Sequence, residues 1–171
     1  MISYNEALAM VRSKAHSFGT EQILLEHAYG RILAGIIKAD RDYPPFNRAS
    51  MDGYALRHDD LLLGIREFKI IATIFAGDDA SLPLSSGECY KIMTGAPVPA
   101  AADVVMRRED TEEGELAMHV RVDTARLFLN IARQGEDMHE GDIVIDSPCI
   151  CETAIIGLLA ALGQKELTVA G

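Results

Sequence analysis

One stretch organises the rest of the chain: Pro44-Pro45-Phe46-Asn47-Arg48-Ala49-Ser50-Met51-Asp52-Gly53-Tyr54-Ala55. Its two prolines fix φ and push the residues before them into extended conformations, so no helix runs through it. Gly53 permits a backbone angle that other residues avoid, and it holds Asp52 where a loop becomes an apolar strand. A carboxylate at such a point predicts contact with a ligand or a metal ion. The alternative is an Asx turn in which Asp52 caps only its own backbone.

Length and composition describe an ordinary folded protein. The 171 residues fit one or two domains, and 49% of them are hydrophobic. With 16 basic against 26 acidic side chains the net charge is −10, which disfavours binding to nucleic acid and to anionic membranes. No apolar run reaches the length of a bilayer span, and the start of the chain lacks a signal-peptide layout. We therefore expect a cytoplasmic location.

The cysteines and histidines do not predict a metal site. The three cysteines, Cys89, Cys149 and Cys151, are an odd number and form no CxxC motif. The five histidines show no metal-ligand spacing with them. We therefore expect reduced, mostly structural thiols and no zinc.

Hydrophobic periodicity divides the chain into helical ends and a β-rich middle. Ser3 and Glu6 form a capping-box pattern that predicts a helix to about Ser17, and a short helical piece is expected over 24–29. From Met51 to Ile145 the period changes to two, which is typical of half-buried strands. Three such runs are predicted: 67–74, 116–122, and one that places Leu127, Leu129 and Ile131 on one face.

The segment from Thr153 to Leu162 predicts a helix that is apolar nearly all round, with Gly163 as its C-terminal cap. Such a helix must be covered on more than one side. The first helical region, another subunit, or both can supply this cover, so we predict a dimer. The alternative is a helix buried within its own chain.

Two further blocks set polar groups beside glycines at strand ends. Thr94 precedes Gly95 after the apolar run Cys89 to Met93, so its hydroxyl and nearby N–H groups can meet a phosphate oxygen, unless they bond only to neighbouring backbone. Asp137 follows Gly135, much as Asp52 precedes Gly53. If Asp52, Thr94 and Asp137 converge, the site is acidic and a phosphate ligand requires a divalent cation, for which Mg²⁺ is the natural candidate.

Two other charged positions have simpler alternatives. Arg133 can supply positive charge to such a site, although a salt bridge at a strand edge also explains it. Glu109 and Asp110 follow the strand Val104 to Met106, and a solvated charged edge is the preferred interpretation there.

Together the blocks resemble the molybdopterin molybdenumtransferase family, which includes bacterial MoeA and the gephyrin E domain. The resemblance covers most of the chain and rests on three motifs and a helix in the same order and spacing: Phe46–Ala55 with its Met-Asp-Gly-Tyr-Ala signature, Lys91–Pro99 continuing to Glu112, Asn130–Asp137 with Gly141-Asp142, and the helix Ile156–Gly163.

The resemblance implies an α+β fold in which a compact, mostly antiparallel β domain is inserted into an elongated region of helices and strands. The β domain is expected over residues 44–140. The elongated region is expected over residues 1–43 and 141–171, and family members dimerise through it.

The resemblance also implies the reaction. Family members take adenylylated molybdopterin and molybdate, cleave the phosphoanhydride with release of AMP, and leave molybdenum on the dithiolene of the pterin. Asp52, Thr94 and Asp137 match the family's functional positions and are the expected catalytic residues, with both aspartates holding Mg²⁺. The expected substrate-binding residues are Ser50, Gly53, Gly95, Glu109 and Arg133.

Three departures from the family pattern limit what is carried over. Ala132 stands where the family usually has an arginine, which removes a bidentate phosphate partner. The order Arg48-Ala49-Ser50 replaces Asn-Ser-Ala and displaces Ser50 by one residue. The family's chain also continues beyond the position of Gly171 into an α/β domain that binds the pterin and a small β domain, so this segment alone is expected to be inactive.

Two other functions remain open at the level of sequence. One is a non-catalytic dimerisation or scaffold module of gephyrin type, which contacts proteins of molybdenum-cofactor assembly. The other is a stand-alone hydrolase that acts on nucleotides through carboxylates and a metal ion.

Overall fold

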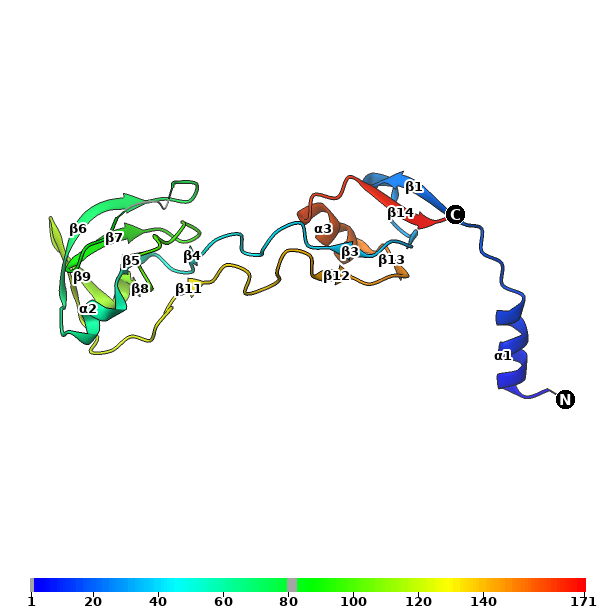
Figure 1. Cartoon of the computed structure of the whole chain (residues 1–171), viewed down its shortest axis with the longest axis horizontal. Helices are drawn as coiled ribbons and strands as arrows, with labels where there is room; N and C mark the ends of the chain where they lie inside the picture. The colour runs from blue at the N-terminus through cyan, green and yellow to red at the C-terminus, as the bar shows by residue number, and fades with distance from the viewer. Residues whose placement is uncertain (1, 80–82) are drawn as a thin grey trace. The chain divides into compact units, whose positions relative to one another are not determined.

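The computed structural model describes residues 2–79 and 83–171, which form two compact units (Figure 1). Unit 1 consists of Met1–Asp40 and Ile143–Gly171, and unit 2 consists of Arg41–Asp142. These limits lie within three residues of the domain boundaries that we expected.

Unit 2 is built on a six-stranded sheet with the order β8-β5-β7-β6-β10-β9. All neighbours in it are antiparallel except β6 and β7, which are parallel, so the expectation of a mostly antiparallel sheet is confirmed. The elements of unit 2 are β4 (Arg48–Ala49), β5 (Gly53–Leu56), α2 (His58–Leu62), β6 (Glu67–Ile74), β7 (Glu88–Ile92), β8 (Val104–Arg107), the 3₁₀ turn η2 (Arg108–Asp110), β9 (Thr111–Glu113), β10 (Ala117–Val120) and β11 (Ile131–Ala132).

Strand β5 lies inside this sheet and is buried on both faces. Its alternate residues point to opposite faces: Tyr54 and Leu56 belong to one apolar cluster and Ala55 to the other. The first cluster also contains Phe68 and Met106, whose side chains are fully buried. The strand that follows Asp52 is therefore held rigidly between two cores.

Unit 1 carries a four-stranded antiparallel sheet, β1-β14-β2-β13, and a second pair, β12-β3. Its elements are α1 (Tyr4–Ser13), β1 (Thr20–Leu24), the 3₁₀ turn η1 (Leu25–His27), β2 (Ile32–Leu33), β3 (Ile37–Lys38), β12 (Ile143–Ile145), β13 (Cys149–Ile150), α3 (Thr153–Ala161) and β14 (Glu166–Ala170). No helix among the described residues is long and apolar enough to cross a bilayer.

The helix α1 begins as predicted but ends early. Ser3 accepts a hydrogen bond from the Glu6 amide and Glu6 bonds back to the Ser3 amide, which is the expected capping box. The helix ends at Ser13 rather than Ser17. The short helical piece expected over 24–29 is confirmed only in part: a single 3₁₀ turn forms over Leu25–His27, and Leu24 belongs to β1, which pairs with β14 from the other end of the chain.

The predicted third run of alternating residues is wrong. Residues 124–126 have no regular structure and residues 127–130 form a turn, in which Phe128 and Asn130 adopt positive φ values of 58° and 56°. Left-handed backbone interrupts the two-residue period, so pairing begins only at Ile131.

The helix α3 begins at Thr153 as predicted and ends at Ala161, one residue before the predicted end, and Gly163 follows its C-terminal cap with φ 69°. Leu159 is the only described residue of α3 that is buried, while Ile155, Ile156 and Leu158 are half-buried. The described residues therefore cover this helix only in part.

Candidate functional site

The first two motif blocks are joined by backbone hydrogen bonds. Gly95 donates its N–H to the Ala49 carbonyl at 2.8 Å, and Ala49 donates to the Ala96 carbonyl at 2.9 Å. Val98 donates to the Asn47 carbonyl at 2.8 Å. The loop after β7 is thus fixed against the segment that leads to Asp52.

The third block pairs with the opposite edge of the same segment. Ile131 and Ala132 of β11 lie opposite Ala49 and Arg48 of β4, and Ser50 donates its N–H to the Asn130 carbonyl at 2.9 Å. All three blocks that are far apart in the sequence therefore meet along residues 47–50.

Asp52 is held by Thr94 and not by its own turn. Its Oδ1 accepts hydrogen bonds from the Thr94 N–H at 2.8 Å and from the Thr94 hydroxyl at 2.7 Å. These residues are 42 positions apart, so the local Asx turn is the wrong interpretation of Asp52. Thr94 uses both its N–H and its hydroxyl as donors to this carboxylate, so neither donor is free to bind a phosphate oxygen.

The two hydrogen bonds from Thr94, first the amide and then the hydroxyl, lower the pKa of Asp52 below its ordinary value of 3.8, and the charge of Arg108 adds to this effect. Asp52 is exposed, and its Oδ2 accepts no hydrogen bond from the described residues. A charged carboxylate with one fixed and one free oxygen is suited to binding a cation.

We expect the contact between Asp52 and Thr94 to survive acidification beyond the ordinary range of an aspartate. Because the folded-state pKa is lowered, the stabilisation is present above the unfolded pKa and is lost as pH falls through the folded pKa. The amide chemical shift of Thr94 should report a titration midpoint below 3.8, and Asp52→Asn should abolish that midpoint. A midpoint at or above 3.8 would contradict this assignment.

Glycine is required at positions 53 and 95 for different physical reasons. Gly95 has φ 83°, a left-handed conformation that disfavours other residues. Gly53 does not, which corrects our prediction of an unusual angle. A Cβ atom at Gly53 would overlap the carbonyl oxygen of Met106 and lie 2.9 Å from its carbon, so a close approach of β5 and β8 requires glycine here.

Asp137 does not join Asp52 and Thr94 within one chain. The Asp137 amide donates to the Tyr43 carbonyl at 3.0 Å, at the opposite end of the 43–52 segment from Asp52. Its side chain is exposed. Among the described residues there is no group of three or more His, Cys, Asp or Glu side chains placed to hold a metal ion.

The remaining predicted residues lie on exposed edges. The Arg133 guanidinium lies 5.5 Å from the centroid of the Phe128 ring, a cation–π contact rather than the salt bridge we considered, and lines a cavity of about 410 Å³ with Phe128 and Gly135. Ser50 and Glu109 are exposed. Among the described residues, neither side chain forms a hydrogen bond with Asp52.

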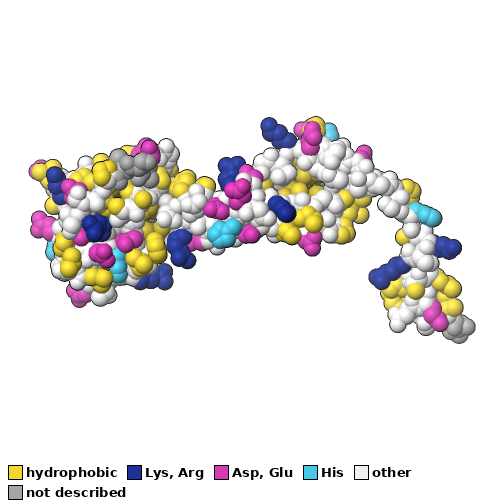
Figure 2. Space-filling model, in the orientation of Figure 1, with side chains coloured by type: hydrophobic (Ala, Val, Ile, Leu, Met, Phe, Trp, Pro, Cys, Tyr) yellow, Lys and Arg dark blue, Asp and Glu magenta, His cyan; other side chains and the backbone are white. Residues whose placement is uncertain are grey.

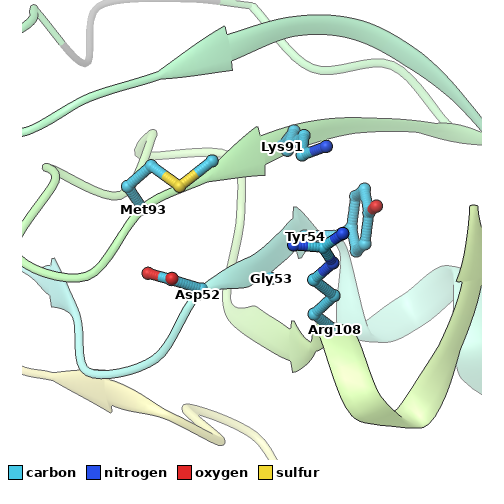
Figure 3. Close-up of a pocket in the computed structure, with 6 residues that line it drawn as sticks. All are labelled: Asp52, Gly53, Tyr54, Lys91, Met93 and Arg108. Carbon is cyan, nitrogen blue, oxygen red and sulfur yellow. The ribbon is translucent and has the colours of Figure 1, made fainter.

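A small cavity of about 20 Å³ adjoins Asp52 (Figure 3). Two charged residues that line it, Lys91 and Arg108, were not predicted as site residues. Their positions at the cavity depend on the register of the sheet strands, which no sequence motif shows. The lining residues are Asp52, Gly53, Tyr54, Lys91, Met93 and Arg108.

Two of the polar side chains that line this cavity, Asp52 and Lys91, already have hydrogen-bond partners. Lys91 Nζ donates to both carboxylate oxygens of Glu113, at 2.7 and 2.9 Å. The Tyr54 hydroxyl is buried and makes no well-formed hydrogen bond with a described residue; burial and the nearby Glu113 carboxylate raise its pKa. Burial also raises the pKa of the Cys89 thiol to about 12, so this cysteine stays protonated and structural, as expected.

Known proteins resemble this chain along nearly its whole length. It is 33% identical over 173 residues to a molybdopterin molybdenumtransferase of Staphylococcus epidermidis, covering 99% of this chain but 41% of that protein. It is 34% identical over 149 residues to molybdopterin molybdenumtransferase 2 of Mycobacterium tuberculosis, covering 85% and 36%. The chain therefore spans less than half the length of these curated relatives.

Solved structures agree. A crystal structure of a molybdopterin biosynthesis MoeA protein from Pyrococcus horikoshii OT3 matches 99% of this chain and 46% of its own, with 31% identity and a TM-score of 0.90. A second from Pyrococcus horikoshii gives 30% identity and a TM-score of 0.84. The model of the MoeA N-terminal region (domain I and II) matches residues 2–163. This chain belongs to the MoeA N-terminal family.

Proposed function

We propose that this chain supplies part of the active site of a molybdopterin molybdenumtransferase. The reaction inserts molybdate into adenylylated molybdopterin and releases AMP. The observation that supports this proposal most directly is the geometry of the Asp52 carboxylate, which Thr94 fixes through Oδ1 while Oδ2 stays free. Family membership and the names of the relatives support the reaction.

The residues fit Mg²⁺ as the cation at Asp52. Magnesium takes one or two carboxylates, keeps several waters and binds substrate phosphate oxygens, so one ionised, exposed carboxylate with a free oxygen suffices. Bound there, the ion would neutralise charge that develops on the phosphates as the anhydride breaks. Asp137 lies at the other end of the 43–52 segment, so in our proposal it contacts a different part of an extended substrate and not the ion at Asp52.

Thr94 and the backbone ladder act by holding Asp52 in place. The backbone hydrogen bonds of residues 47–50 fix the segment that leads to Asp52 between the loop after β7 and the residues at the start of β11. The two donors of Thr94 select one orientation of the carboxylate. A site held in this way needs little reorganisation when the substrate arrives.

Unit 1 supports the proposal of a homodimer. The apolar helix α3 leaves Ile155, Ile156 and Leu158 only half-buried in one chain, and exposed Ile150 and Ile32 lie on the paired strands β13 and β2. Burial of this surface against a second copy would remove apolar area from water.

A turnover assay tests the proposal. The 171-residue chain with adenylylated molybdopterin, molybdate and Mg²⁺ should release no AMP, because the resemblance assigns pterin binding to a further α/β domain. A chimera in which this chain replaces the corresponding region of the Staphylococcus epidermidis relative should release AMP. Release by the chain alone would refute the shared site. A folded chimera that is inert, beside an active parent, would refute the function.

A further inference from the structure

The cavity beside Asp52 contains one cation without a bonded partner. Lys91 is neutralised by Glu113, which it contacts through both carboxylate oxygens. Arg108 makes no side-chain hydrogen bond or ion pair with any described residue. Its charge nevertheless lowers the pKa of both Asp52 and Glu113, so the guanidinium lies near two carboxylates and bonds to neither.

The neighbouring Arg107 shows that the lack of a bonded partner is not common to every arginine of this turn. Arg107 is paired with Asp110: its Nε lies 2.8 Å from Oδ2 and its Nη2 lies 3.1 Å from Oδ1. The two arginines are adjacent and both are exposed. Only Arg108 lines the cavity.

A backbone hydrogen bond fixes the position of the Arg108 main chain relative to Asp52. The Arg108 N–H donates to the Asp52 carbonyl at 3.1 Å, at the end of the β5–β8 pairing. In Figure 3 the Arg108 guanidinium lies beside Tyr54, while the Asp52 carboxylate points away from it, toward the side of Met93. The cavity thus has a negative group at one end and a free positive group at the other.

We propose that Arg108 binds an oxygen of a tetrahedral oxyanion of the substrate and positions that anion next to Asp52. This inference rests on the proposed function and adds a substrate-binding residue to it. A cavity of about 20 Å³ has room for one oxygen-sized group, so one oxygen enters while the rest of the anion stays outside. The guanidinium offers several N–H donors in a planar fork that suits oxyanions.

A positive group in this cavity lowers the electrostatic cost of bringing an anion next to Asp52. An anion that approaches Asp52 meets a negative carboxylate, and the nearest ammonium is already paired with Glu113. Arg108 supplies the compensating positive charge on the substrate side of the cavity. The oxyanion is either a phosphate ester or molybdate, since both present the same tetrahedral oxygens.

The test is an NMR titration of the 171-residue chain that follows the Arg108 Nε–H signal and the backbone amides. AMP is added in one arm and molybdate in the other, so the arm that responds identifies the source of the oxyanion. We expect saturable shifts at Arg108 and Gly53, with a dissociation constant on the order of 1 mM. Arg108→Gln should weaken binding about tenfold or more, because a charged hydrogen bond is lost.

Arg107→Gln is the matched control, and it should leave the affinity unchanged within about twofold, the range of an exposed pair. Arg108→Lys should recover part of the lost affinity, since it keeps the charge without the fork. Equal affinity in Arg108→Gln and Arg107→Gln, or no saturable shift at Arg108 with either anion, would overturn the inference. The titration needs no turnover, so an inactive chimera with normal anion binding refutes the proposed function and leaves Arg108 as an anion-binding residue.

Discussion

Asp52→Asn is expected to slow AMP release about 100- to 1000-fold in the chimera that carries this chain, the effect of removing one preorganised charged group from a catalytic site. Asparagine keeps a carbonyl oxygen in the place of Oδ1, so it can still accept the Thr94 N–H and hydroxyl bonds. The substitution therefore removes the charge and keeps the geometry. The measurement is kcat for AMP release at saturating Mg²⁺.

Two companion variants sharpen this result. Asp59→Asn makes the same chemical change at an exposed position of α2, and its activity should match the unsubstituted chimera. Thr94→Val removes the hydroxyl donor but keeps the amide donor, so we expect a loss of about tenfold, the value of one hydrogen bond to a charged group. Activity of Asp52→Asn close to that of Asp59→Asn would show that the Asp52 charge takes no part in the reaction.

The sequence was most informative where neighbouring residues determine the outcome. The period of two along residues 67–74 predicts β6, and the apolar run closed by Gly163 predicts α3. The capping box at Ser3 is likewise a contact between residues three positions apart. Each of these patterns is complete within one helix or one strand.

Predictions failed where a distant partner decides the local structure. Residues 20–24 form a strand only because β14, at the far end of the chain, pairs with them. The turn before β11 depends on left-handed backbone at Phe128, a residue whose side chain gives no signal of that conformation. Local patterns carry no information about either cause.

In the candidate site, too, local patterns were informative and contacts between distant residues were not predicted. A glycine beside a polar residue singled out Asp52 and Thr94, and the structure joins their side chains, while their functional roles stay predictions. It did not reveal that Thr94 uses both donors on Asp52, nor that Arg108 faces the same cavity through the register of β5 and β8. Asp137 also stands near a glycine, but the antiparallel register of β4 and β11 places it at the other end of the 43–52 segment from Asp52.

Gly53→Ala is expected to destabilise unit 2 by at least about 3 kcal/mol, at the upper end of the range for overpacking. A Cβ atom there would overlap the Met106 carbonyl oxygen, and that atom belongs to backbone, which cannot rotate away as a side chain can. Because β5 pairs with β7 on its other side and is buried on both faces, it cannot shift to relieve the overlap. The change should therefore separate β5 from β8.

The measurement is urea unfolding followed by near-ultraviolet circular dichroism of tyrosine, since the chain has no tryptophan and the buried Tyr54 and Tyr90 lie in unit 2. The control is Gly157→Ala in α3, where a Cβ atom meets nothing within 4 Å and the backbone is helical. That change should leave the tyrosine transition in place and stabilise the helix by about 0.5–1 kcal/mol. If Gly53→Ala unfolds at the same urea concentration as the unsubstituted chain, the close approach of β5 and β8 is not what requires glycine next to Asp52.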